Sequence, residues 1–230
     1  MKNNLRAYVM TSVLVLAVLA CSFGTQAPVS QPPADATQAI SPDLATLPAG
    51  TRAQTDISCL MGYWEVELDS LKNVANSIIM IPSLYITSVG PSILFAFYTV
   101  SEPSNSPYRM DVWYTDVLIS ANIQSTGQTN PQQLDLHLEG VFTADLYSYT
   151  PGEITYQPIP GESQLQVMDV WLNGEPLTDS PIDLSDWTDE GHAGDLHYEC
   201  LGAGRISLLS PVAGQPVYLQ VTTPSTQISP

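Results

Sequence analysis

Residues 57–222 are dominated by short runs in which apolar and polar residues alternate, the pattern of half-buried β-strands. In the clearest run, 133–138, Leu134, Leu136 and Leu138 alternate with polar residues. We expect further strands at 62–68, 84–89, 93–100, 110–123, 141–149, 154–157, 165–172, 195–201, 205–209 and 217–221. Evenly spaced short strands separated by Gly, Pro and Asn turns favour an all-β sandwich or barrel.

One stretch departs from this alternation and predicts a single helix after the first strand. Its apolar residues recur at intervals of three and four and would share one helical face: Leu71, Val74, Ala75, Ile78 and Ile79. Asp69 or Ser70 is a suitable N-cap residue, and Pro82 would end the segment. The domain therefore combines one helix with many strands.

The first 20 residues have the pattern of a signal peptide. Lys2 and Arg6 precede an apolar run at 7–20, which is shorter than the roughly 20 residues of a membrane span. The run ends in Val-Leu-Ala-Cys at Cys21, which resembles the lipobox of bacterial lipoproteins, whose cysteine is lipidated. The alternative is an ordinary secretory signal with an incidental cysteine. Both predict export, and the first predicts anchoring to the outer face of the cell membrane.

Two segments that flank the domain show no apolar period. Residues 21–56 contain five prolines among Gln, Ala, Ser and Thr, and 223–230 is a short polar tail. Such compositions cannot bury enough apolar surface to offset the entropy of ordering, so we expect a disordered tether and a disordered tail.

The charge of the chain is strongly one-sided. The formal net charge is -17, and removal of residues 1–20 would leave four Lys and Arg residues against 23 acidic residues, a net charge of -19. Binding of nucleic acid requires basic patches, so we expect no nucleic-acid partner. We also expect a monomer without a cofactor.

Cysteine usage fits an oxidising compartment. If Cys21 carries lipid, Cys59 and Cys200 remain as an even pair, which we expect to form a disulfide. The bond would close a long loop, for which the chain-entropy relation gives about 4–5 kcal/mol of stabilisation.

The run TDEGHAGDLHYEC, residues 188–200, is dense in side chains that can bind metals. Three of them are candidate zinc ligands: His192, Asp195 and His197. Read as a strand, however, 195–201 points Leu196, Tyr198 and Cys200 inward and leaves Asp195 and His197 on a convex outer face. We therefore expect solvated surface residues, and a metal site is the alternative.

The motifs of common enzymes are missing from the sequence. There is no Gly-x-Ser-x-Gly nucleophile motif and no Gly-rich phosphate loop. Acidic pairs such as Asp183/Asp186 or Asp189/Glu190 could imitate a glycosidase pair, but 23 acids produce such pairs by chance. We expect that the protein is not an enzyme.

Two stretches resemble a known superfamily. CLMGYWEVELDSLKNVANSI, residues 59–78, places Gly-x-Trp in a first strand that leads into a helix. HYECLGAGRISLLSP, residues 197–211, is similar to the closing hairpin of lipocalin-like domains in bacterial lipoproteins. Together they resemble the calycin superfamily of lipocalins and fatty-acid-binding proteins.

The resemblance implies an antiparallel up-and-down β-barrel of about ten strands, closed by pairing of its first and last strands. That closure would bring Cys59 close to Cys200. Gly62, Trp64 and Arg205 would be structural, with Arg205 packed over Trp64. The resemblance also implies a set of candidate ligand-binding residues: Tyr85, Phe97, Arg109, Trp113 and Tyr218.

The function that the resemblance implies is the binding of a small apolar or amphipathic ligand without catalysis. The alternative is a structural or interaction module of the cell envelope, with a barrel filled by its own side chains. In both cases the lipid on Cys21 would hold the protein at the membrane.

The lipidation of Cys21 is directly testable. Cells grown with an alkyne-bearing fatty acid should label the wild-type protein, and Cys21→Ser should abolish the label because it removes the acylated sulfur. Gel fluorescence of the purified protein measures both. Equal labelling of the two proteins would contradict a lipid anchor at this residue.

Overall fold

The computed structural model of the chain describes residues 57–79, 83–101, 106–124, 130–177, 181–184, 193–211 and 213–223. The expected signal peptide, Cys21, the tether at 21–56 and all of the tail after Thr223 lie outside these residues. Within the described residues, no helix has the length and hydropathy needed to span a membrane.

The described residues form twelve strands, one α-helix and one 3₁₀ helix. In chain order they are η1 (Ile57–Leu60), β1 (Gly62–Val66), α2 (Leu68–Ile78), β2 (Leu84–Gly90), β3 (Ile93–Thr99), β4 (Tyr108–Ile123), β5 (Gln132–Thr150), β6 (Glu153–Pro158), β7 (Gln164–Leu172), β8 (Glu175–Pro176), β9 (Ile182–Asp183), β10 (Gly194–Gly202), β11 (Arg205–Leu209) and β12 (Pro216–Thr222).

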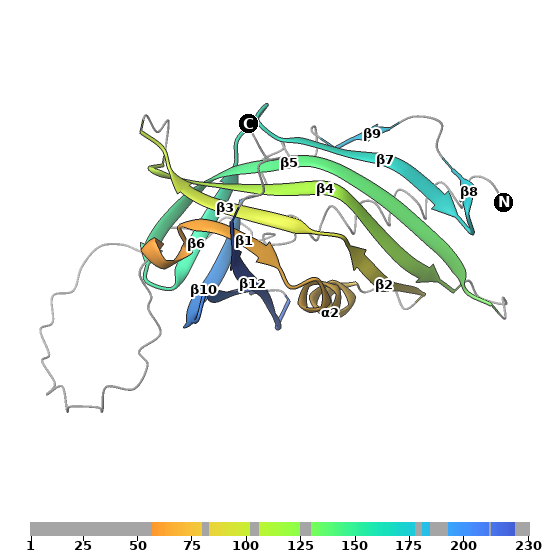
Figure 1. The fold of residues 1–230 in the computed structure, drawn as a ribbon, viewed down its shortest axis with the longest axis horizontal. Helices are drawn as coiled ribbons and strands as arrows, with labels where there is room; N and C mark the ends of the chain where they lie inside the picture. Colours follow the sequence, from red (N-terminus) through yellow and green to blue (C-terminus); the bar gives the residue numbers. More distant parts are fainter. Residues whose placement is uncertain are drawn as a thin grey trace, which may run out of the picture.

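Eight of the strands close into an antiparallel up-and-down barrel. Strands β1, β3, β4, β5, β6, β10, β11 and β12 each pair with the next, and β12 pairs with β1. The predicted all-β barrel with one helix after the first strand is confirmed, although it closes with eight strands instead of about ten. The number is lower because β2, β7, β8 and β9 pair outside the ring (Figure 1).

The two longest strands carry the sheet beyond the barrel. At one end β4 and β5 lie between β3 and β6, and at the other end they lie between β2 and β7 (Figure 1). The predicted strands 133–138 and 141–149 are one continuous strand, β5. The alternation passes unbroken through Gly140, so Leu138 and Phe142 are both buried.

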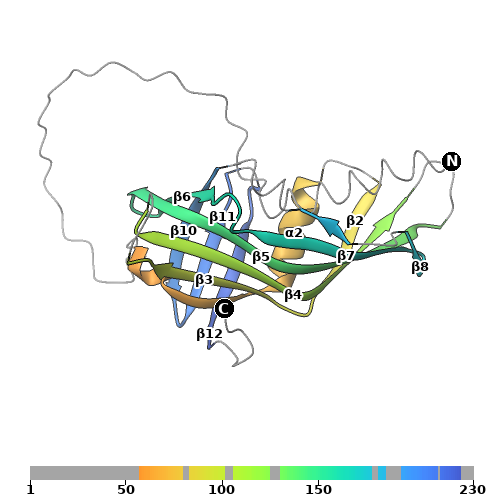
Figure 2. The same ribbon diagram turned by 90° about the horizontal axis from the view of Figure 1, so that it is seen from above.

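Helix α2 begins directly where β1 ends and packs against β2 and β12 (Figure 2). Its N-cap residue is Glu67, so the prediction of Asp69 or Ser70 was wrong. Glu67 is fixed from outside the helix, because its backbone N–H donates to the Tyr218 carbonyl at 2.8 Å. Ser70 instead donates its hydroxyl to the Glu67 carbonyl at 2.7 Å.

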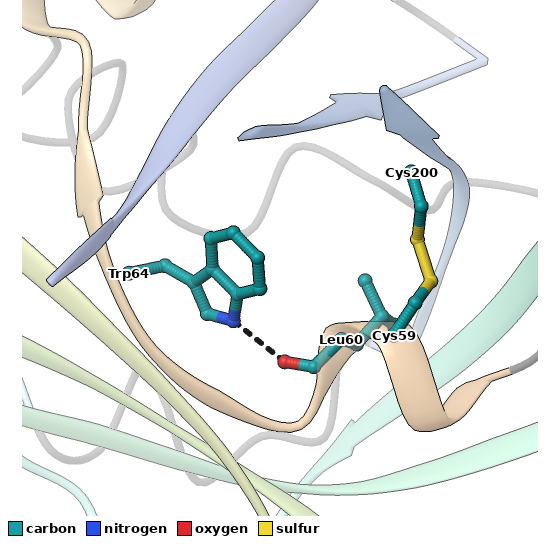
Figure 3. The surroundings of a disulfide bond; sticks show 4 residues. All are labelled: Cys59, Leu60, Trp64 and Cys200. Carbon is teal, nitrogen blue, oxygen red and sulfur yellow. Dashed lines mark hydrogen bonds between the residues drawn. A yellow bond between two sulfur atoms is a disulfide. The ribbon is translucent and has the colours of Figure 1, made fainter. Parts of the chain in front are cut away.

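A disulfide joins the segment before β1 to a late strand (Figure 3). Cys59 in η1 is bonded to Cys200 in β10, with a Cα–Cα distance of 6.4 Å, which confirms the predicted pair. Beside it, the Trp64 indole N–H donates to the Leu60 carbonyl at 2.6 Å. Gly62, with φ of +131°, turns the chain from η1 into β1.

Arg205 connects three of the elements that meet at the barrel seam. Its Nε and Nη2 donate to the two carboxylate oxygens of Glu67 at 2.7 and 2.8 Å. Its guanidinium lies 4.2 Å from the ring centroid of Tyr218. The ring under Arg205 is therefore Tyr218 and not Trp64, because Trp64 points into the barrel and Tyr218 points outward.

Gly140 marks the place where β5 changes partners. It has φ of +130°, and a Cβ there would overlap the backbone carbonyl of Gln164 at the start of β7. We expect Gly140→Ala to lower the free energy of unfolding by about 3 kcal/mol or more, because backbone strain adds to a clash that no rotamer relieves. Urea unfolding followed by circular dichroism measures the change.

Gly174→Ala is the matched control for this prediction. Gly174 also has a positive φ, +81°, but a Cβ there would contact nothing within 4 Å. It should cost only the backbone strain, about 1–2 kcal/mol. If the two variants lose the same free energy of unfolding, the close packing of β7 on Gly140 does not contribute to stability.

Candidate functional site

An apolar cavity of about 90 Å³ lies inside the barrel, beneath helix α2. Its walls come from the helix and from seven of the barrel strands, as well as from β2. The lining residues are mostly apolar; those from the helix and from β3 and β4 are Leu71, Val74, Ala75, Ile93, Phe95, Met110, Val112, Tyr114 and Ile119. Typical sites for drug-sized ligands measure roughly 300–1,000 Å³, so this cavity suits a narrow chain or a small ring.

Strand periodicity decides which side chains reach the cavity. On β4, Met110, Val112 and Tyr114 line it, whereas Arg109 and Trp113, which are next to lining residues in the sequence, point to the outside. Alternate residues of a strand face opposite sides of the sheet, so neighbouring positions cannot share a site inside the barrel. The same parity places Val217 against the cavity and Tyr218 on the outer wall.

Polar side chains hold helix α2 over the cavity. The Asn76 amide donates to the Ile86 carbonyl at 2.9 Å and accepts from the Ile86 N–H at 2.7 Å, as a neighbouring strand would. Ser77 donates its hydroxyl to the Ala213 carbonyl at 3.3 Å. These contacts join the helix to β2 and to the segment before β12.

None of the five predicted ligand-binding residues lines this cavity, so the structure does not bring them together as a site. Tyr85 is 57% exposed on the outer side of β2, and Trp113 stacks on Tyr63 across the outer wall at 6.4 Å. Phe97 does point inward, but it is 1% exposed and belongs to the packed core. Arg109 and Tyr218 are held in outer-wall contacts with charged neighbours.

The sequence contained the signal that would have found the lining. The spacing of residues 71, 74 and 75 predicts one apolar helical face, and strict alternation along β4 favours the neighbours of Arg109 and Trp113 as inward residues. What the alternation could not supply is the position of the helix over the barrel end, which depends on contacts far apart in the chain.

Arg109 lies in a polar cluster on the outer wall of the barrel and not in the cavity lining. Its Nη1 donates to Glu162 at 2.9 Å, and its Nε lies 3.5 Å from Asp145, which is 4% exposed. Asp111, next but one along β4, accepts a hydrogen bond from the Tyr98 hydroxyl at 3.0 Å. Three carboxylates therefore surround one guanidinium.

Burial dominates the ionisation of two members of this cluster. It raises the pKa of Asp111 above its ordinary value, against the opposing effect of hydrogen bonds from Thr143 and Tyr98 and of the Arg109 charge. Burial, with the Asp111 carboxylate beside it, raises the pKa of Tyr98 to about 12. Tyr98 therefore remains a neutral hydrogen-bond donor at physiological pH.

The histidines of the described residues occupy outer faces. His197 points outward from β10 with its Nδ1 3.4 Å from Glu153, and Asp195 accepts a hydrogen bond from Thr155 at 2.6 Å. His137 lies between Asp116, at 2.8 Å, and Asp169, at 3.5 Å.

His192, Asp186, Asp189 and Glu190 lie outside the described residues. Among the residues that are described, no three His, Cys, Asp or Glu side chains are arranged to hold a metal ion. The alternation predicted for 195–201 is confirmed, with Leu196 and Tyr198 buried and Asp195, His197 and Glu199 exposed.

Comparison of the chain with protein-family models, with curated proteins and with solved structures found no match. The closed eight-stranded barrel with a helix after the first strand is compatible with a calycin-like fold. The cavity and its lining are therefore the main guide to function.

The raised pKa of Asp111 predicts a stability effect with a definite sign. The folded state binds the proton more tightly than the unfolded state, so stability rises as pH falls through the folded-state pKa toward the ordinary value. Asp111→Asn should therefore stabilise the protein at pH 7, and its advantage over wild type should shrink as pH is lowered to 4. Urea unfolding across this range measures the difference.

Glu175→Gln is the control for this variant. Glu175 is exposed on β8, so the change removes one negative charge without relieving burial. A difference in unfolding free energy between Asp111→Asn and wild type that does not change with pH would contradict a raised pKa of Asp111. A loss of stability in Asp111→Asn at pH 7 would contradict it as well.

Proposed function

We propose that this barrel binds a small apolar or amphipathic ligand in the cavity beneath α2 and performs no chemistry on it. The observation that carries this proposal is the cavity itself. It remains open inside an otherwise well-packed barrel, and its lining is mostly apolar. Cavities of this kind stay dry and favour apolar ligands, because water finds too few hydrogen-bond partners in them. Removal of apolar surface from water would supply the binding energy.

We further propose that the protein belongs to the calycin superfamily and acts outside the cytoplasm. The Gly-x-Trp in β1 and the helix that follows it support the first part, together with the closed barrel. The apolar N-terminus with Cys21 supports the second, as an exported protein anchored by lipid to the outer face of the membrane. A shared fold does not by itself imply a shared function, so the cavity remains the stronger argument.

The small volume of the cavity favours a second candidate function. A barrel with little free space could serve as a structural or interaction module of the cell envelope, with its acidic outer surface as the contact. Such a protein would bind no small ligand, and filling the cavity would leave its properties unchanged or make it more stable.

Filling the cavity distinguishes the two functions. Ala75 is 1% exposed and lines the cavity from α2, so Ala75→Leu places three more carbon atoms there. We expect the affinity for the better of two C10 ligands, decan-1-ol and decanoate, to fall at least tenfold because the ligand would clash with the added atoms. Isothermal titration calorimetry measures both ligands.

Asn73→Leu is the matched control, since Asn73 is exposed on the same helix and does not line the cavity. It should bind as wild type does. Overpacking can cost about 1–3 kcal/mol, so thermal unfolding must show that Ala75→Leu is folded at the titration temperature. If wild type binds neither ligand, the binding function is wrong; if folded Ala75→Leu binds like wild type, the cavity is not the site.

A further inference from the structure

We infer that the cavity selects a neutral alkyl ligand, such as a long-chain alcohol or ester, over the corresponding free fatty acid. This inference rests on the proposed function and specifies the chemical class of its ligand. It follows from where the cationic side chains of the described residues lie, from the polar groups of the lining and from the charge of the whole chain.

No cationic side chain of the described residues is available to a carboxylate in the cavity. Lys72 pairs with Asp69 at 2.7 Å, and Arg205 binds both carboxylate oxygens of Glu67. Arg109 lies on the outer wall between Glu162 and Asp145. All three are absent from the cavity lining and have acidic partners.

All the residues with polar side chains in the cavity lining are neutral. They are Tyr114, Tyr156, Ser210 and Gln215, of which only Gln215 is exposed. Hydroxyl and amide groups can exchange hydrogen bonds with an alcohol, an ester or another carbonyl group. A buried carboxylate without a cationic partner would lose its hydration and gain no compensating charge.

The exterior of the protein reinforces this preference. The net charge of -17 creates a negative potential that lowers the local concentration of anions and leaves neutral ligands unaffected. This effect is long-ranged and is screened by salt, whereas the cost of burying a carboxylate is local and persists at high salt. Salt therefore separates the two contributions.

Three C10 ligands that share one chain length test the selection: decan-1-ol, methyl decanoate and decanoate. At pH 8, isothermal titration calorimetry of the full chain should show decanoate binding at least tenfold more weakly than both neutral ligands. The difference should remain at least fivefold in 1 M NaCl, where the screening length is about 3 Å. Equal affinities at low salt would overturn the inference and leave the proposed function intact.

A charge placed at the exposed part of the lining provides the converse test. Gln215→Arg should raise the ratio of the decanoate affinity to the decan-1-ol affinity at least fivefold, because the guanidinium would pair with the carboxylate and has no such partner on the alcohol. Gln166→Arg, on the exposed side of β7 and away from the cavity, makes the same change in net charge.

The control separates a local from a global effect. Gln166→Arg should leave the ratio of the two affinities close to that of wild type. If both variants raise this ratio equally, or if Gln215→Arg does not raise it, the cavity lining is not what selects the ligand. If none of the three ligands binds the wild-type protein, the proposed function itself fails.

Discussion

The pairing of β1 with β12 is the interaction on which the rest of the structure depends. A sheet with free edge strands exposes unpaired backbone groups, and closure satisfies them on the strands of the ring. Here closure joins strands at opposite ends of the domain, and side chains secure the seam: the Cys59–Cys200 disulfide, the bidentate Arg205–Glu67 pair and the Tyr218 ring beneath it. Without closure there would be no interior for helix α2 to cover.

Helix α2 has its position because β1 ends where the seam is fixed. Glu67 directly follows the last residue of β1 and is the N-cap of the helix, and its backbone and side chain are held by β12 and β11. The helix must therefore leave the seam in one direction, and Asn76 then attaches it to β2. The cavity lies between this fixed helix and the inner walls, so its volume depends on contacts made outside it.

Charge and apolar surface are separated across the barrel wall. The cationic side chains of the described residues pair with acids on the outside or at the seam, and the polar groups that line the cavity are neutral. This separation underlies the proposal of a neutral ligand. The Arg109 cluster belongs to the outer wall, where burial raises the pKa of Asp111.

Much of the fold could be read from the sequence, because alternation is a local property of each strand. It predicted every strand except the two-residue β8 and β9, the inward row of Leu134, Leu136 and Leu138, and the outward positions of Asp195 and His197. The three- and four-residue spacing of apolar residues from Leu71 to Ile79 predicted the helix. The disulfide was predicted because Cys59 and Cys200 remain as a pair once Cys21 is assigned to the lipid anchor. The resemblance to calycins suggested closure, which no local pattern can require.

Only the tertiary structure decided which inward side chains meet. The resemblance implied Tyr85, Phe97, Arg109, Trp113 and Tyr218 as ligand residues, but the cavity is lined by other residues, brought together by the closure of the barrel and the position of α2. The number of strands in the ring was also beyond the sequence, since β2 and β7 look like barrel strands locally but pair with the extended ends of β4 and β5. Sequence periodicity determines which face of a strand is apolar, and long-range pairing determines what that face encloses.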